Sequence, residues 1–162
     1  MIAEDAITLV KALIREAGCD GIYYCVQNAE TFRFTSEEYH KFVEPYDLKV
    51  LDYANSISKY NILHCCGWSG DKNRVEVWKN YKAAAVNWAV YVEDMDLNAG
   101  RDFFNTNCVL GGFDNRKNGV LYSGTLDEIK SEKRYNIGAD CTLSNDIDLL
   151  HIKCVADTAR SI

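Results

Sequence analysis

The sequence predicts an α/β fold built on a parallel sheet. Five apolar segments with the composition of short strands alternate along the chain with segments of helical spacing. Strands that are joined by helices run parallel to one another. With 162 residues, 48% of them apolar, the chain can bury a core, and its composition is not that of a disordered segment. We therefore expect a single domain over residues 1–162.

The helices are predicted from apolar residues at helical spacing and from capping signals. Ile7 and Ile14 fall on one face of the first helix, and capping boxes begin at Thr35 and Thr125. Pro45 lies inside the second helical pattern, so either the helix kinks there or two helices meet. The predicted helices cover residues 4–17, 35–57, 72–83, 95–105, roughly ten residues from 125, and 146–160.

The strands are predicted from short runs that are apolar, aromatic or β-branched and that lack a helical period. These runs cover residues 19–26, 61–66, 84–91, 108–114 and 138–143. In parallel α/β folds the functional site lies at the carboxyl ends of the strands. Residues at and just after these ends are therefore the first candidates for a site.

The charge balance excludes several classes of function. Lys and Arg number 18 and Asp and Glu 24, which gives a net charge of −6, and the basic residues are scattered rather than clustered as phosphate binding requires. No apolar run approaches the roughly 20 residues of a membrane helix, and residues 1–5 are acidic rather than basic, unlike a signal peptide. Seven cysteines without a secretory signal are typical of reduced thiols. We expect a cytoplasmic protein without a nucleic-acid or membrane partner.

The sharpest candidate site is a metal site at His64, Cys66 and Cys141. Because alternate residues of a strand share a face, His64 and Cys66 point the same way, at the carboxyl end of their strand. A catalytic zinc has three protein ligands and one open position, and Cys141 after the last strand is the best third ligand. Spacing alone leaves an ordinary explanation open, since buried histidines and cysteines are common.

The remaining cysteines carry weaker signals. Cys65 follows His64 directly and forms a vicinal pair with Cys66, which could be a redox element, but a strand sends the two side chains to opposite faces. The others lie near strand starts, within strands or in the last helix, and we expect them to be ordinary buried thiols. They are Cys19, Cys25, Cys108 and Cys154.

Several polar and aromatic residues at or near strand ends are candidates for catalysis or substrate binding. Asp114 and Asp96 could orient a substrate or support the metal ligands, although loop carboxylates are more often solvated or capping residues. Trp88, Asn115 and Gln27 are the candidates for substrate contact, with the alternative for Trp88 that it belongs to the core.

Several short sequence blocks follow one another along nearly the whole chain. They are Ala17-Gly18-Cys19-Asp20-Gly21-Ile22, Pro45-Tyr46, His64-Cys65-Cys66-Gly67, Asn87-Trp88, Gly111-Gly112-Phe113-Asp114-Asn115, Ser123-Gly124-Thr125, Glu128-Ile129 and Gly138-Ala139-Asp140-Cys141-Thr142. In this order they resemble the carboxyl-terminal part of the uroporphyrinogen decarboxylase superfamily, which includes the cobalamin-dependent methyltransferases. The resemblance implies a partial (β/α)8 barrel, or TIM barrel, with parallel strands corresponding to strands four to eight.

The resemblance is greatest to the methyltransferase branch. That branch is similar in carrying H-x-C on one strand and a distant cysteine after the last strand, which together bind a zinc that activates a thiol. Here the ligands would be His64, Cys66 and Cys141, and a corrinoid such as methylcobalamin would be the methyl donor. The alternative is the decarboxylase branch of porphyrin biosynthesis, whose lyases use no cofactor and bind a tetrapyrrole. Cys141 lies near where that branch carries a histidine, which weakens this alternative.

The length accounts for only part of such a barrel. A complete barrel has about 250 residues, or roughly 31 per βα unit, so this chain corresponds to about five units. The counterparts of strands one to three are missing from the resemblance. We expect a separate amino-terminal polypeptide or a second copy of the chain to complete the barrel. A further alternative is a catalytically silent remnant that acts as a metal-binding or assembly module.

Overall fold

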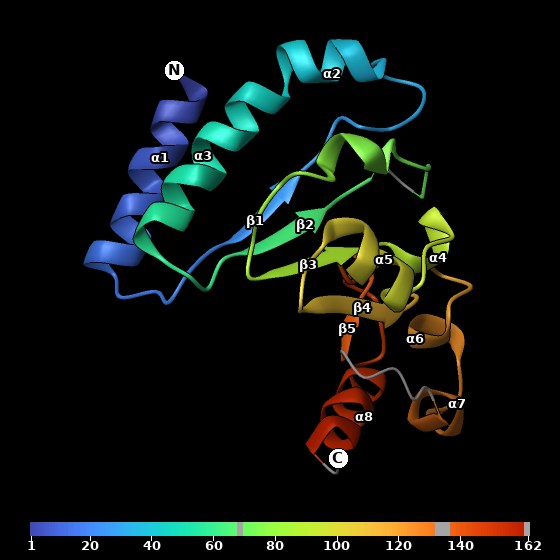
Figure 1. The fold of residues 1–162 in the computed structure, drawn as a ribbon. Helices are drawn as coiled ribbons and strands as arrows, with labels where there is room; N and C mark the ends of the chain where they lie inside the picture. Colours follow the sequence, from blue (N-terminus) through green and yellow to red (C-terminus); the bar gives the residue numbers. More distant parts are fainter. Residues whose placement is uncertain (68–69, 132–136, 161–162) are drawn as a thin grey trace.

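A parallel sheet of five strands runs through the part of the chain that the computed structural model describes, residues 1–67, 70–131 and 137–160 (Figure 1). Strands that are neighbours in the sheet are consecutive in the chain, and each pair is parallel. The strands are β1 (Tyr23–Val26), β2 (Ile62–Cys65), β3 (Ala85–Trp88), β4 (Val109–Phe113) and β5 (Ile137–Ala139). This order is that of a partial βα barrel, which confirms the predicted fold class.

Helices connect the strands and cover the sheet. They are α1 (Ile2–Lys11), continued by a π-helical turn (Ala12–Glu16), α2 (Ser36–Phe42), α3 (Glu44–Ile57), α4 (Val90–Glu93), α5 (Leu97–Phe104), α6 (Val120–Ser123), α7 (Leu126–Ser131) and α8 (Leu149–Arg160). In Figure 1, α1 and α3 lie side by side near β1, while α7 and α8 lie near β5, at the other end of the sheet. None of the helices in the described part of the chain is both long and apolar enough to cross a membrane.

The two faces of the sheet have different side chains because residues alternate along each strand. Leu63 of β2 pairs with Val86 of β3, and both belong to the main apolar core under the helices. His64 pairs with Asn87 of β3 on one side and with Cys25 of β1 on the other. These three residues therefore share the opposite face, which corresponds to the inside of a barrel.

Large aromatic side chains fill the core between sheet and helices. Trp78 and Trp88 are fully buried, and the N–H group of each indole has an acceptor. Nε1 of Trp78 donates to the hydroxyl of Tyr39 over 2.8 Å, and Nε1 of Trp88 donates to the carbonyl of Met95 over 2.9 Å. Pairing both N–H groups removes the cost of burying them.

The predicted helix over 72–83 is wrong. Only Val75–Trp78 is helical there, as one 3-10 turn. The backbone just before it is held by distant partners, because Arg74 N donates to the carbonyl of Ala29 and Asn73 N donates to the carboxylate of Glu93. These long-range bonds replace the local bonds of a helix, and local spacing could not reveal them.

Other element boundaries differ from the sequence pattern. Two helices meet at Val43, and Pro45 lies in the first turn of α3, where its missing N–H leaves no helical bond unmade. The third predicted strand stops at Trp88, and α4 follows where the strand was expected to run to residue 91. The helix predicted from Thr125 ends at Ser131, and residues 132–136 lie outside the described part of the chain.

Candidate metal centre

His64 and Cys66 lie at the carboxyl end of β2, as the strand period predicts. His64 is 3% exposed and Cys66, one residue beyond the strand, is 8% exposed. Cys65 between them points to the other face and lies in the main apolar core. This placement is contrary to a redox role for the vicinal pair, because the two sulfurs face opposite sides of the sheet.

Cys141 lies two residues after β5, and its side chain contacts those of His64 and Cys66. Its Sγ lies 3.7 Å from Sγ of Cys66 and 3.5 Å from Nε2 of His64. The carboxyl ends of β2 and β5 face the same side because all strands are parallel. The three predicted ligands therefore form one cluster.

The spacing of these donor atoms fits a tetrahedral zinc ion. With Zn–S near 2.3 Å and Zn–N near 2.0 Å, two sulfurs of a tetrahedral site lie about 3.8 Å apart, and a sulfur and a nitrogen about 3.5 Å apart. The separations of Cys141 from Cys66 and from His64 agree with these values. Thiolate and imidazole are also the donors that zinc prefers, so this group of residues could hold a metal ion.

Asn87 fixes the orientation of the His64 ring. Its side-chain oxygen accepts from Nδ1 of His64, and its amide group donates to the carbonyls of Leu110 over 3.0 Å and Ala139 over 3.2 Å. Two carbonyl acceptors set which end of the Asn87 amide faces the ring. Nδ1 therefore carries a proton, and Nε2 is the ring nitrogen that faces Cys141 and that a metal would bind after losing its own proton.

Tyr23 covers the same ring from β1. Its ring stacks on His64 with centroids 5.4 Å apart, and its hydroxyl donates to the Asn87 oxygen over 2.7 Å. Burial raises the pKa of Tyr23 to about 12, so the hydroxyl stays protonated and remains a donor. Sequence reasoning assigned no role to Asn87 or Tyr23, although the polar Asn87 in an otherwise apolar strand was a usable signal.

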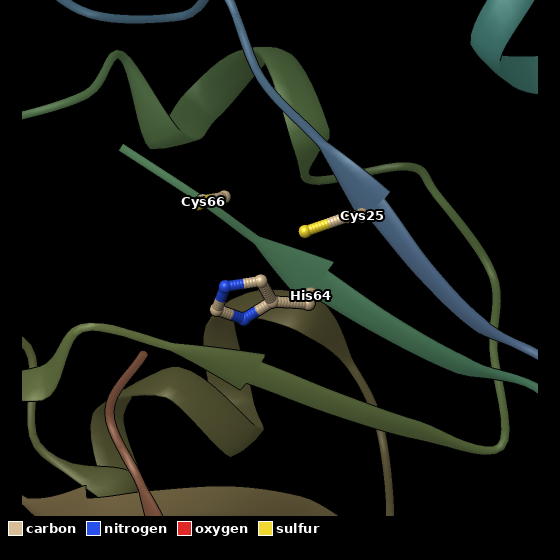
Figure 2. A group of neighbouring side chains, drawn as sticks. All are labelled: Cys25, His64 and Cys66. Atoms are coloured by element: carbon tan, nitrogen blue, oxygen red, sulfur yellow. The ribbon is translucent and has the colours of Figure 1, made fainter. Parts of the chain in front are cut away.

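Cys25 on β1 also belongs to the cluster, contrary to the expectation that it is an ordinary buried thiol. Its sulfur lies within 4.8 Å of the ligand atoms of His64 and Cys66, and Figure 2 shows it directed toward them. Cys25 is exposed, as are Cys19 and Cys108. The sequence pattern missed Cys25 because its neighbourhood depends on the register between β1 and β2.

Hydrogen bonds within the cluster shift the acidity of its members. Burial lowers the pKa of His64, but hydrogen bonds with Cys141 and Cys66 outweigh burial and raise this pKa to about 9. The hydrogen bond with Cys66 raises the pKa of Cys141 to about 12, and a hydrogen bond with Cys66 lowers the pKa of Cys25. The donors thus share protons, which a bound metal would displace.

A cavity of about 680 Å³ opens beside the cluster, and Cys141 is part of its wall. Asn73 lines the cavity, is 8% exposed, and has no hydrogen-bond partner for its buried side-chain oxygen. Its amide nitrogen donates to Glu93, whose pKa is raised by burial. The Asn73 side-chain oxygen is itself buried, so it is not open to the cavity.

The aspartates named from the sequence lie outside the donor cluster. Asp114 lines the cavity and forms an ion pair with Arg116 over 2.7 Å. Burial would raise the pKa of Asp114, but the hydrogen bonds from Arg116 outweigh burial and lower this pKa, so the carboxylate is ionised. The catalytic role of Asp114 stays a prediction. Asp96 is exposed and caps α5 by accepting from the backbone N–H groups of Asn98 and Ala99 over 2.8 and 2.9 Å. Asp96 is therefore a helix cap in this structure, and its catalytic role stays a prediction.

The three substrate-contact candidates have different surroundings. Trp88 is fully buried in the core on the far face of β3, so its assignment to substrate contact is wrong. Asn115 lines the cavity, and its amide donates to the carbonyl of Thr142 over 2.6 Å. Gln27 is exposed, and its side-chain Nε2 donates to Sγ of Cys66 over 3.6 Å. Contacts of Asn115 and Gln27 with a substrate stay predictions.

Asp140, directly after β5, forms hydrogen bonds with β4 and with α4 beside the site. The sequence pattern did not indicate this role. Its carboxylate accepts from the backbone N–H of Gly112 over 2.6 Å and from that of Tyr91 over 3.3 Å. Gly112 has φ of 104°, a backbone conformation that favours glycine. These bonds hold β4 and the segment that carries Cys141 together.

The chain has a structural neighbour but no sequence match. No family model matches it, and no curated protein is similar to it in sequence. A solved structure, a methyltransferase from Methanosarcina mazei, is similar with a TM-score of 0.75 and 17% identity over 98% of this chain. The match covers 47% of that protein, so this chain spans less than half its length. At this identity the likeness shows the fold alone.

Proposed function

We propose that the chain is a zinc-dependent methyltransferase of the uroporphyrinogen decarboxylase superfamily, which transfers a methyl group from a corrinoid donor to a small-molecule thiol. The observation that carries this proposal is the tetrahedral spacing of the donor atoms of His64, Cys66 and Cys141. When bound, zinc supplies the positive charge that keeps a substrate thiol ionised as the nucleophilic thiolate. The methyltransferase fold of the structural neighbour is compatible with this proposal.

The chain's own residues prepare the site in three ways. Asn87 holds the His64 ring so that Nε2 faces the cluster. Cys141 belongs both to the cluster and to the wall of the cavity, so a substrate in the cavity lies next to the donors. Asn115, which lines the same cavity, is then placed to contact the substrate.

A second polypeptide or a second copy of the chain completes the barrel in this proposal. Among the described strands, β1 and β5 are each paired on one side only. Such edges present free backbone donors and acceptors to another strand. The structural neighbour has more than twice the length of chain that matches here, which leaves room for the missing strands in a full assembly.

Metal analysis of the purified chain tests the zinc site. We expect about one zinc per chain. The variants His64→Ala, Cys66→Ala and Cys141→Ala should each lose it to a chelator that leaves the wild type loaded. Cys19→Ala is the matched control, because Cys19 is an exposed cysteine outside the cluster. Wild-type protein that binds no zinc would contradict the proposal and favour the cofactor-free decarboxylase alternative.

Methyl transfer itself needs a second measurement. Methylation of 2-mercaptoethanol by methylcobalamin should depend on zinc and should increase when a polypeptide carrying the missing strands is added. A zinc-loaded chain that transfers no methyl group, even with this polypeptide present, would instead be a metal-binding or assembly module.

A further inference from the structure

Cys25 differs from the other donors in position and exposure. It comes from β1, which is paired only with β2 among the described strands, and its side chain is exposed, whereas His64 and Cys66 are buried. Its sulfur nevertheless lies within 4.8 Å of the ligand atoms of both (Figure 2). Its exposed side chain is free to rotate about χ1 and so to approach the other donors.

The three predicted ligands leave one tetrahedral position for a fourth donor. In catalytic zinc sites water or substrate occupies that position, whereas sites with three cysteines and one histidine are closed. Here a fourth donor, the third sulfur of the group, lies beside the cluster on Cys25, which is paired with His64 in the strand register. The chain therefore contains the full donor set of a closed site.

We propose that Cys25 is the fourth metal ligand while no substrate thiol is bound, and that it is the ligand which the substrate thiol replaces. This inference rests on the zinc site of the proposed function. Cys25 is the donor that can leave most readily, because moving an exposed side chain uncovers no buried group, unlike moving His64 or Cys66. A closed site of this kind would hold the metal firmly until a substrate arrives.

The exchange is balanced without an oxidant or reductant. The bond between the metal and the Cys25 sulfur breaks, and a bond between the metal and the substrate sulfur forms. The proton released by the substrate thiol passes to the Cys25 sulfur, so Cys25 leaves as a neutral thiol. The metal therefore has the same number of sulfur ligands before and after the exchange.

Alkylation of the wild-type chain tests the first part without any substitution. The protein, kept reduced, is treated briefly with N-ethylmaleimide with and without one equivalent of zinc, and labelling is measured for each cysteine by peptide mass. Zinc should slow labelling of Cys25 at least about tenfold, because a coordinated thiolate is protected. Cys19 and Cys108 are also exposed and serve as internal controls whose labelling should not change. Equal labelling of Cys25 with and without zinc would overturn the inference.

Cobalt substitution counts the sulfur ligands directly. The near-ultraviolet charge-transfer absorption of Co²⁺ grows with the number of bound thiolates, so Cys25→Ala should lose roughly one third of it. Cys25→Ser checks that any loss follows from the sulfur rather than from altered packing, and Cys19→Ala should keep the wild-type spectrum. An unchanged spectrum in both Cys25 variants would show that Cys25 is not a ligand.

The replacement step is tested with thiophenol, whose arylthiolate gives a charge-transfer band distinct from that of cysteine. Thiophenol should bind cobalt-loaded Cys25→Ala at least about tenfold more tightly than wild type, because in wild type it must displace a ligand of high effective concentration. Equal binding to both proteins, or binding to neither, would overturn the replacement. A wild-type chain that binds no metal would overturn both the proposed function and this inference. A chain that binds metal with the same spectrum in the presence and absence of Cys25 would overturn this inference alone.

Discussion

The side-chain oxygen of Asn87 accepts a hydrogen bond from Nδ1 of His64 across two neighbouring strands. Since this bond sets the proton on Nδ1, Asn87→Ala should weaken zinc binding by about 10–100-fold while leaving the number of bound ions unchanged. Competition with a chromophoric chelator measures the affinity. Asn87→Asp keeps an acceptor for Nδ1 and should retain more affinity than the alanine variant. Equal affinity of wild type and Asn87→Ala would mean that Asn87 does not position the ligand.

Asp96 provides a test that separates helix capping from catalysis. Its carboxylate accepts from two backbone N–H groups at the start of α5. Asp96→Ala should lower the free energy of unfolding by about 0.5–2 kcal/mol, measured by urea denaturation, and should leave zinc content unchanged. Asp96→Asn is the control, because asparagine caps helices as well as aspartate does. Loss of methyl transfer at unchanged stability would support the catalytic interpretation.

The placement of His64, Cys65 and Cys66 was predictable because the two-residue period of a strand is a local property. Cys141 could also be placed, because the carboxyl ends of parallel strands all lie at the same edge of the sheet. Cys25 could not, since its contact with His64 depends on the register between β1 and β2. A register arises from packing over many residues, and the sequence of one strand does not encode it.

Trp88 and Asp96 both lie away from the donor cluster, and the two displacements have a related physical origin. Trp88 lies at the carboxyl end of β3, where sites are expected, but the strand period directs its side chain to the helix-covered face. Asp96 follows a strand in sequence, yet α4 intervenes and places it at the start of α5. Distance along the chain from a strand end is therefore a weaker guide than the face on which a residue lies.

Gly100 of α5 packs directly on the indole of Trp88, where an added Cβ would overlap the ring. Alanine normally favours a helix over glycine by about 0.5–1 kcal/mol, so a destabilising Gly100→Ala would report the contact itself. We expect a loss of about 1–3 kcal/mol in the free energy of unfolding, measured by urea denaturation. Asn98→Ala, at an exposed position of the same helix, should change stability by less than about 0.5 kcal/mol. A stabilised Gly100→Ala variant would contradict the close packing.

Asp47 should make the stability of the chain depend on pH in the acidic range. The carboxyl group accepts from the hydroxyls of Tyr39 over 2.9 Å, Tyr24 over 3.3 Å and Tyr81 over 3.5 Å. Burial raises the pKa of Asp47 above its ordinary value of 3.8, with a further contribution from Glu44, and the three hydroxyls oppose this shift without cancelling it. The folded chain therefore prefers the neutral carboxyl group.

The sign of the effect follows from that preference. A carboxyl group with a raised folded-state pKa stabilises the fold most below its unfolded pKa, and this contribution is lost as pH rises through the folded-state value. Asp47→Asn has no such titration, so it should gain stability relative to wild type as pH rises from about 4 to about 7, in urea unfolding at each pH. If the difference between wild type and Asp47→Asn were constant with pH, the carboxylate would be ionised in the folded chain at no extra cost, and the account of its burial would be wrong.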